Sequence, residues 1–169
     1  MNALVLLDKD AKTELSEDLK ARVVRTLEEK GYHVEAFDLG KNEAYPCLGC
    51  LLCLTKHPGE CVSKDMVNEI RKNVKKYSAT FFLTPVVFGH PSSTIANAMN
   101  RGTGCHDWQV IIGFGEDIDD EERSTFVDLV VKHRGEADIV HPGMDRKVEA
   151  FVTTSVDDNA AICQTVRSE

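Results

Sequence analysis

Four of the chain's cysteines lie close together, between positions 47 and 61. They are Cys47, Cys50, Cys53 and Cys61. Two residues lie between the first and second and between the second and third, and seven residues lie between the third and fourth. Closely spaced thiolates can surround an iron-sulfur cluster such as 4Fe-4S. Structural zinc sites usually take two pairs of ligands from more distant parts of a chain. The spacing therefore favours a cluster, with zinc and a set of uncoordinated thiols as the alternatives.

The elements that must position these cysteines are predicted from alternating apolar runs and helical patterns. Strands are predicted at residues 4–7, 33–39, 79–83, 108–112 and 148–152, with helices between and after them. All are expected to be buried on both faces except residues 33–39, which are expected at an edge of the sheet. Such alternation predicts an α/β fold, a flavodoxin-like three-layer sandwich. We expect its five-stranded parallel sheet to have the order 2-1-3-4-5. The length of 169 residues fits a single domain over residues 1–169.

A ligand site is expected where the strand order reverses, between strands 1 and 3. In doubly wound sheets ligands bind there, beyond the carboxyl ends of the strands. The loops that matter follow residues 7, 39, 83 and 112. The cysteines lie in the second of these, a turn-rich loop over residues 40–61. Loops of this length in compact domains are usually functional or disordered.

The overall charge excludes some classes of partner. The chain has 28 acidic and 20 basic residues, a net charge of -8 and a pI of about 5.3. Such a surface repels phosphodiester backbones, so general nucleic-acid binding is not expected. No apolar run approaches the ~20 residues of a membrane span, and the first residues lack the pattern of a secretory signal. We expect a cytoplasmic protein without membrane contact, in which cysteines stay reduced.

Two motifs resemble a known family. Residues 46–53, 58–61 and 65–66 are similar to the cysteine motif of iron-sulfur flavoproteins and their flavodoxin-like NAD(P)H:FMN reductase relatives. Residues 84–89, at the end of the third predicted strand, with Ser92, Ser93, Asn100 and Arg101 after them, resemble a second motif of the same family. The resemblance implies that Cys47, Cys50, Cys53 and Cys61 hold an iron-sulfur cluster.

The resemblance also implies which residues hold FMN. In the family, the loop that follows the third strand wraps the isoalloxazine ring, and backbone amides near the ring tune its potential. The corresponding residues are Thr84, Pro85, Val86, Val87, Phe88 and Gly89. We expect a loop over residues 84–91 and a turn after residue 112 that approaches the same ring. That turn consists of Gly113, Phe114 and Gly115, whose glycines permit close backbone approach.

The loop after the first strand departs from the family. Family members have small residues and hydroxyls there, which hold the phosphate at a helix N-terminus. Residues 8–16 contain no glycine, and Asp8, Asp10 and Glu14 repel a dianion. Lys9, Lys12 and Thr13 compensate in part. Since each charge-assisted hydrogen bond to phosphate contributes roughly 1.5–3 kcal/mol, we expect a weakened phosphate loop that holds FMN loosely, or riboflavin almost equally well.

The function implied by the resemblance is flavin-dependent redox chemistry. We expect an FMN-dependent oxidoreductase, similar to NAD(P)H:FMN reductases or to iron-sulfur flavoproteins that transfer electrons. Its partner is a nicotinamide nucleotide or a small electron carrier, and family members form homo-oligomers. The alternative is a flavodoxin-like domain that has lost FMN and binds a metal or a protein partner without catalysis.

Overall fold

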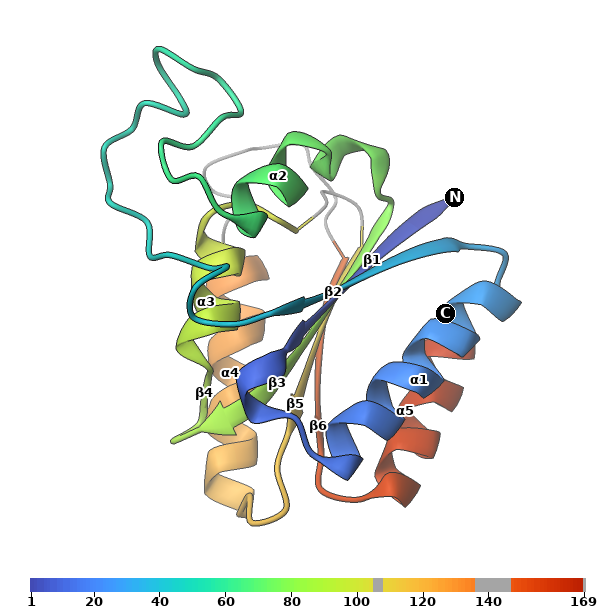
Figure 1. The fold of residues 1–169 in the computed structure, drawn as a ribbon. Helices are drawn as coiled ribbons and strands as arrows, with labels where there is room; N and C mark the ends of the chain where they lie inside the picture. The colour runs from blue at the N-terminus through green and yellow to red at the C-terminus, as the bar shows by residue number, and fades with distance from the viewer. Residues whose placement is uncertain (105–107, 136–146, 169) are drawn as a thin grey trace.

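A parallel sheet with helices on both faces forms the centre of the molecule (Figure 1). The computed structural model describes residues 1–104, 108–135 and 147–168. Five parallel strands lie in the order β2-β1-β3-β5-β6, which confirms the predicted order 2-1-3-4-5. They are β1 (Asn2–Asp8), β2 (His33–Leu39), β3 (Ala79–Val87), β5 (Trp108–Phe114) and β6 (Lys147–Thr153).

The helices divide between the two faces according to the alternation of side chains along the strands. One face of β1 (Ala3, Val5, Leu7) packs against α1 and α5. The opposite face (Leu4, Leu6) packs against α2, α3 and α4. The helices are α1 (Glu14–Glu29), α2 (Met66–Lys72), α3 (Ser93–Asn100), α4 (Asp120–Gly135) and α5 (Val156–Ser168), with 3-10 turns η1 (Lys9–Ala11) and η2 (Val74–Lys76).

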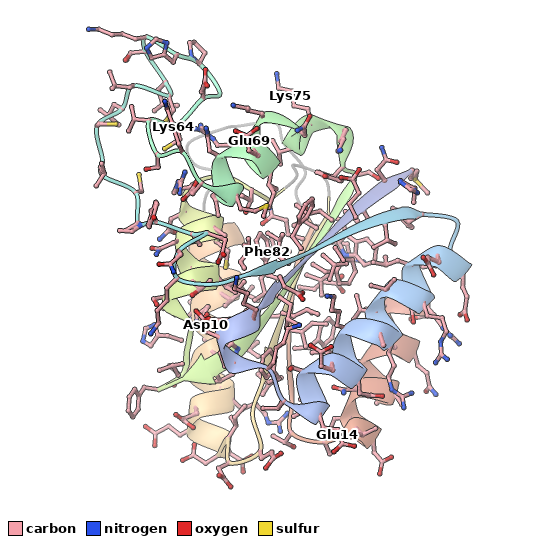
Figure 2. All side chains as sticks on the ribbon, in the orientation of Figure 1. Asp10, Glu14, Lys64, Glu69, Lys75 and Phe82 are labelled. Atoms are coloured by element: carbon pink, nitrogen blue, oxygen red, sulfur yellow. The ribbon has the colours of Figure 1, made fainter. Side chains whose placement is uncertain are left out.

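The central strands are buried on both faces, as their uninterrupted apolar sequences predict. Figure 2 shows Phe82 of β3 in the interior, whereas Lys64, Glu69 and Lys75 lie on the exterior around α2. The strand β2 is half-exposed along most of its length and forms one edge of the sheet. Among the described helices, none has the length and apolar character needed to cross a bilayer.

A hairpin replaces the predicted loop over residues 84–91. The strand β3 continues to Val87 and turns back into β4 (His90–Pro91), which pairs with it in antiparallel fashion. The central residues of the turn, Phe88 and Gly89, have φ angles of 50° and 73°. Positive φ at both positions is the pattern of a type I′ turn, whose twist matches that of paired strands. Sequence patterns missed this extension because Pro85 is normally a signal that a strand ends.

The second difference concerns Gly113 and Phe114, which were expected in a turn. Both belong to β5 and pair with Thr84 and Pro85 of β3. A Cβ atom at Gly113 would lie 2.6 Å from Cγ2 of Val86 and 3.0 Å from the ring of Phe126. Close packing between β3 and α4 therefore accounts for this glycine without any ligand.

We expect Gly113→Ala to destabilise the fold by about 1–3 kcal/mol, because the added methyl group overpacks the core. Urea denaturation measures this change. In the double variant Val86→Ala, Gly113→Ala the cost of the added methyl group should shrink, since the atom it meets first is gone. Unchanged stability of Gly113→Ala would show that the close contact with Val86 does not constrain this position.

Candidate functional site

The hairpin at the end of β3 presents apolar surface at the carboxyl edge of the sheet. The side chain of Phe88 is 86% exposed and that of Val87 is 45% exposed. A Cβ atom at Gly89 would lie 2.7 Å from Cγ2 of Thr125, so the turn rests on α4. Exposed aromatic and aliphatic groups on a rigid turn, next to the point where the strand order reverses, can pack on one face of a planar ring.

The base of the hairpin is fixed by Thr84, which is fully buried. Its hydroxyl donates to the carbonyl of Pro85 at 3.1 Å and accepts from the backbone N–H of Ser92 at 2.9 Å. The side chain of Ser92 caps α3 by accepting from the N–H of Ile95 at 3.3 Å. Thr84 thus joins both ends of the hairpin, so its role is to hold the hairpin in place.

The loop after β1 is closed by its own carboxylates. Asp8 is only 3% exposed. One carboxylate oxygen accepts from the N–H of Asp10 at 2.9 Å, and the other accepts from the hydroxyl of Ser92 at 2.5 Å. Asp10 in turn accepts from the N–H of Lys41 at 2.9 Å. The N–H groups of Asp10 and Lys41 and the hydroxyl of Ser92 therefore already have anionic partners.

The residues expected to compensate for the missing phosphate loop are engaged as well. Lys9 pairs with Glu43 at 2.7 Å. Lys12 pairs with Asp38 at 2.8 Å, and this hydrogen bond is the main reason why the pKa of Lys12 is raised. The hydroxyl of Thr13 accepts from the N–H of Ser16 in a capping box at the start of α1. The structure therefore places Lys9 and Thr13 beside the loop and gives both of them internal partners.

The four clustered cysteines line one cavity of about 860 Å³. Cys47 and Cys50 are exposed, Cys53 and Cys61 are half-buried, and all four are free thiols. Within the described parts of the chain, no three Cys, His, Asp or Glu side chains are arranged to hold a metal ion. The donor set suits a cluster, but the thiols do not converge on a common centre.

A buried ion pair attaches this loop to the body of the protein. The guanidinium of Arg101, at the end of α3, bonds both carboxylate oxygens of Asp65, and these side chains are 1% and 0% exposed. Arg101 also donates to the carbonyl of Tyr45 at 3.1 Å. Among the described residues its buried Nε has no hydrogen-bond partner. Burial alone would raise the pKa of the Cys61 thiol, but hydrogen bonds from Ser63 and the charge of Arg101 outweigh it and lower the pKa.

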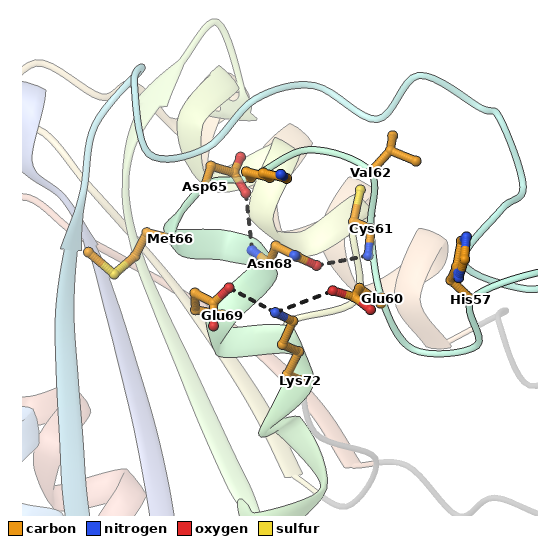
Figure 3. A pocket seen from close by; sticks show the side chains of 10 residues that line it. His57, Glu60, Cys61, Val62, Asp65, Met66, Asn68, Glu69 and Lys72 are labelled. Atoms are coloured by element: carbon orange, nitrogen blue, oxygen red, sulfur yellow. Dashed lines mark hydrogen bonds and ion pairs between the residues drawn. The ribbon is translucent and has the colours of Figure 1, made fainter.

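A second cavity, of about 790 Å³, shares Cys61 with the first and is lined by residues between positions 57 and 72 (Figure 3). The backbone N–H of Cys61 donates to the side-chain oxygen of Asn68 at 2.8 Å. Lys72 bridges Glu69 and Glu60 at its rim, at 2.9 and 3.4 Å. These contacts fix the end of the cysteine loop against α2.

The cysteine loop and the hairpin lie at opposite ends of α3. The helix begins at Ser92, beside Asp8 at the carboxyl edge, and ends at Arg101, beside Asp65. Eight helical residues span about 12 Å. In Figure 1 the cysteine loop extends past α2 at the top of the view, whereas β4 lies near the bottom. The sequence did not predict that Asp8 binds Ser92 at one end of α3 or that Asp65 binds Arg101 at the other. The only hint was that Ser92 and Arg101 lie in the second motif.

Comparison with known proteins confirms the family that the two motifs resemble. The sequence profile of the family described as NADPH-dependent FMN reductase matches residues 1–110 of this chain. The chain belongs to that family. An iron-sulfur flavoprotein of Methanocaldococcus jannaschii is 32% identical over 83 residues, which cover 49% of this chain and 42% of the relative. The chain spans less than half the length of this relative.

Solved structures confirm the predicted flavodoxin-like sandwich. An NAD(P)H:quinone oxidoreductase from Methanothermobacter marburgensis superposes with a TM-score of 0.63 at 12% identity, over 99% of this chain and 96% of its own. A flavodoxin from the domain Archaea gives a TM-score of 0.56 at 11% identity, over 99% and 94% of the two chains. At identities this low, the two structures show the fold of the chain alone.

We expect Arg101→Met to cost about 3–5 kcal/mol of folding free energy, because it leaves the carboxylate of Asp65 buried without its cation. Burial alone would raise the pKa of Asp65, but its hydrogen bonds from Arg101, Tyr45 and Asn68 lower it. The pair therefore stabilises the fold above the ordinary pKa of an aspartate, and this contribution is lost as the pH falls through the lowered value. Urea denaturation at neutral and acidic pH measures both effects.

The matched control is Lys132→Met, which breaks the pair between Lys132 and Asp128 on α4. These side chains are 66% and 63% exposed, so the change should cost at most about 1 kcal/mol. A comparable, small cost for Arg101→Met would contradict the anchoring role.

Proposed function

We propose that this chain binds a flavin beyond the carboxyl ends of β1, β3 and β5 and is an oxidoreductase that uses a nicotinamide nucleotide. The observation that carries the proposal is the exposed hairpin tip of Val87 and Phe88. These residues belong to the second family motif and lie next to the point where the strand order reverses. When bound, a flavin accepts a hydride from a reduced nicotinamide and passes the electrons on singly or as a pair.

The chain's own residues position the ring and shield it from water. Val87 and Phe88 supply the apolar contact, and the backbone of Gly89 supplies polar groups near the ring edge. Thr84, with Pro85 and Val86, holds the hairpin from below. Phe114 is buried and packs beneath the proposed flavin site. Gly115 follows it at the same edge of the sheet, where its N–H donates to the carbonyl of Thr153. Gly113 acts through packing.

We further propose that Cys47, Cys50, Cys53 and Cys61 bind an iron-sulfur cluster in their shared cavity. Four thiolates are the ligand set of such clusters, and a relative of this chain is an iron-sulfur flavoprotein. The buried Nε–H of Arg101 supports the proposal, because this unsatisfied donor lies near Cys61 and can donate to a ligating sulfur. Zinc is the competing occupant.

We also propose that copies of the chain associate through the cysteine loop. Its leucines Leu48, Leu51 and Leu54 are between 60% and 72% exposed. Apolar groups gathered on one loop favour contact with another protein surface. Since the flavin edge and the cysteine loop lie at opposite ends of α3, a second copy would bring one subunit's cluster near another's flavin.

We expect Phe88→Asn to weaken flavin binding about tenfold, because the change removes a ring contact while asparagine still tolerates the positive φ of this position. Quenching of riboflavin and FMN fluorescence measures the dissociation constants, and NADPH should bleach the bound flavin's absorption under anaerobic conditions. Val131→Asn, which removes a half-exposed valine from α4, is the control and should leave both constants unchanged. Wild-type protein that binds neither flavin at millimolar concentration would instead support the flavin-free alternative.

Anaerobic reconstitution tests the cysteine site separately. We expect about four irons per chain and broad absorption near 400 nm, both lost in Cys50→Ser. Cys163→Ser is the control, since Cys163 is buried on α5 among apolar residues and should not affect iron uptake. Stoichiometric zinc without iron uptake would refute the cluster.

A further inference from the structure

The anion position at the carboxyl end of β1 is already filled by the protein itself. The start of a helix at this edge normally offers unpaired N–H groups and a favourable dipole to a phosphate. Here two donors at this edge, the N–H of Asp10 and the hydroxyl of Ser92, both bind the carboxylate of Asp8. Asp8 is 3% exposed, so its charge is a built-in part of the site.

The surrounding contacts close the same loop from the side of β2. The side chains of Lys9 and Glu43 pack over Gly40, where a Cβ atom would lie 2.6 Å from Cε of Lys9 and 2.9 Å from a carboxylate oxygen of Glu43. Glu43 binds the ammonium of Lys9 and accepts from the N–H of Gly40, both within 2.9 Å. A ligand phosphate would have to displace these carboxylates to reach the lysine.

The cap hydroxyls of the first turn of α1 are already engaged. Its cap hydroxyl, that of Thr13, accepts from the N–H of Ser16, and the hydroxyl of Ser16 accepts from the N–H of Thr13 at 2.9 Å. Glu14 and Glu17 add negative charge to this turn. Figure 2 shows Asp10 and Glu14 in the segment that leads from β1 into α1. A dianion at this edge meets carboxylates where a phosphate-binding loop presents amides.

We infer that this chain selects flavins that lack a 5′-phosphate, with Asp8 as the residue that determines specificity. The inference rests on the proposed flavin site and names its ligand class: riboflavin or another isoalloxazine without a phosphate. In the proposed site the hairpin contacts only the ring, which both flavins share. These contacts therefore contribute equally to the binding of riboflavin and FMN. The carboxylates of Asp8 and Asp10 act against FMN alone.

The test compares riboflavin with FMN in parallel fluorescence titrations at low ionic strength. Wild-type protein should bind riboflavin more tightly than FMN. Asp8→Asn keeps the shape of Asp8 and the hydrogen bond from the Asp10 N–H, reverses the direction of the bond with the Ser92 hydroxyl, and removes the charge. FMN binding should therefore tighten at least tenfold while riboflavin binding stays within twofold. Asp10→Asn, at an exposed position, should shift FMN affinity in the same direction if Asp8→Asn does not fold. Asp128→Asn, on the exposed face of α4, removes one charge elsewhere and should change neither constant.

The outcomes separate the two proposals. Wild-type FMN binding that is as tight as riboflavin binding, or tighter, overturns the selectivity and leaves the flavin site intact. An equal gain for both flavins in Asp8→Asn also overturns it, because Asp8 would then act on the ring. Failure of both flavins to bind overturns the proposed function itself, and the inference with it.

Discussion

The carboxylate of Asp8 accepts hydrogen bonds from Asp10 and Ser92, and these contacts join the end of β1 to the start of α3. Through Ser92 the same network reaches Thr84 on β3. Buried carboxylates are costly unless their hydrogen bonds are satisfied, so the three elements must keep this arrangement. The hairpin that follows Thr84, the closed loop after β1 and the direction of α3 all depend on it.

The direction of α3 in turn separates the two chemical regions of the chain. The helix runs from the network around Asp8 to the buried pair of Arg101 and Asp65, which attaches the cysteine loop. The flavin edge and the thiols therefore lie at different ends of one short helix. In the proposed association of copies, the exposed leucines of the cysteine loop would lie at the contact between one copy's thiols and another copy's flavin edge.

Much of the fold could be predicted because parallel sheets have strong local signals. Uninterrupted apolar strands such as residues 4–7, alternating with amphipathic helices, determine the strand order and the edge where ligands bind. The charges around Asp8 also showed that the phosphate loop is altered. Three features could not be predicted, because each depends on tertiary contacts: the extension of β3 past Pro85, the packing of Gly113 against Val86, and the burial of Asp8 against Ser92. The spacing of the cysteines predicts their chemistry, but it does not reveal how their loop folds.

The most direct test of the closed phosphate loop observes the phosphate itself. The phosphorus NMR resonance of FMN can be followed through a pH titration with the protein in excess, while quenching of flavin fluorescence shows that the ring is bound. If the carboxylates occupy the anion position, the phosphate of bound FMN stays in solvent and titrates near the free value of about 6. A displaced resonance that no longer titrates in this range would contradict the account, because it would place the phosphate beside the Asp10 N–H and the Ser92 hydroxyl, which the carboxylate of Asp8 occupies.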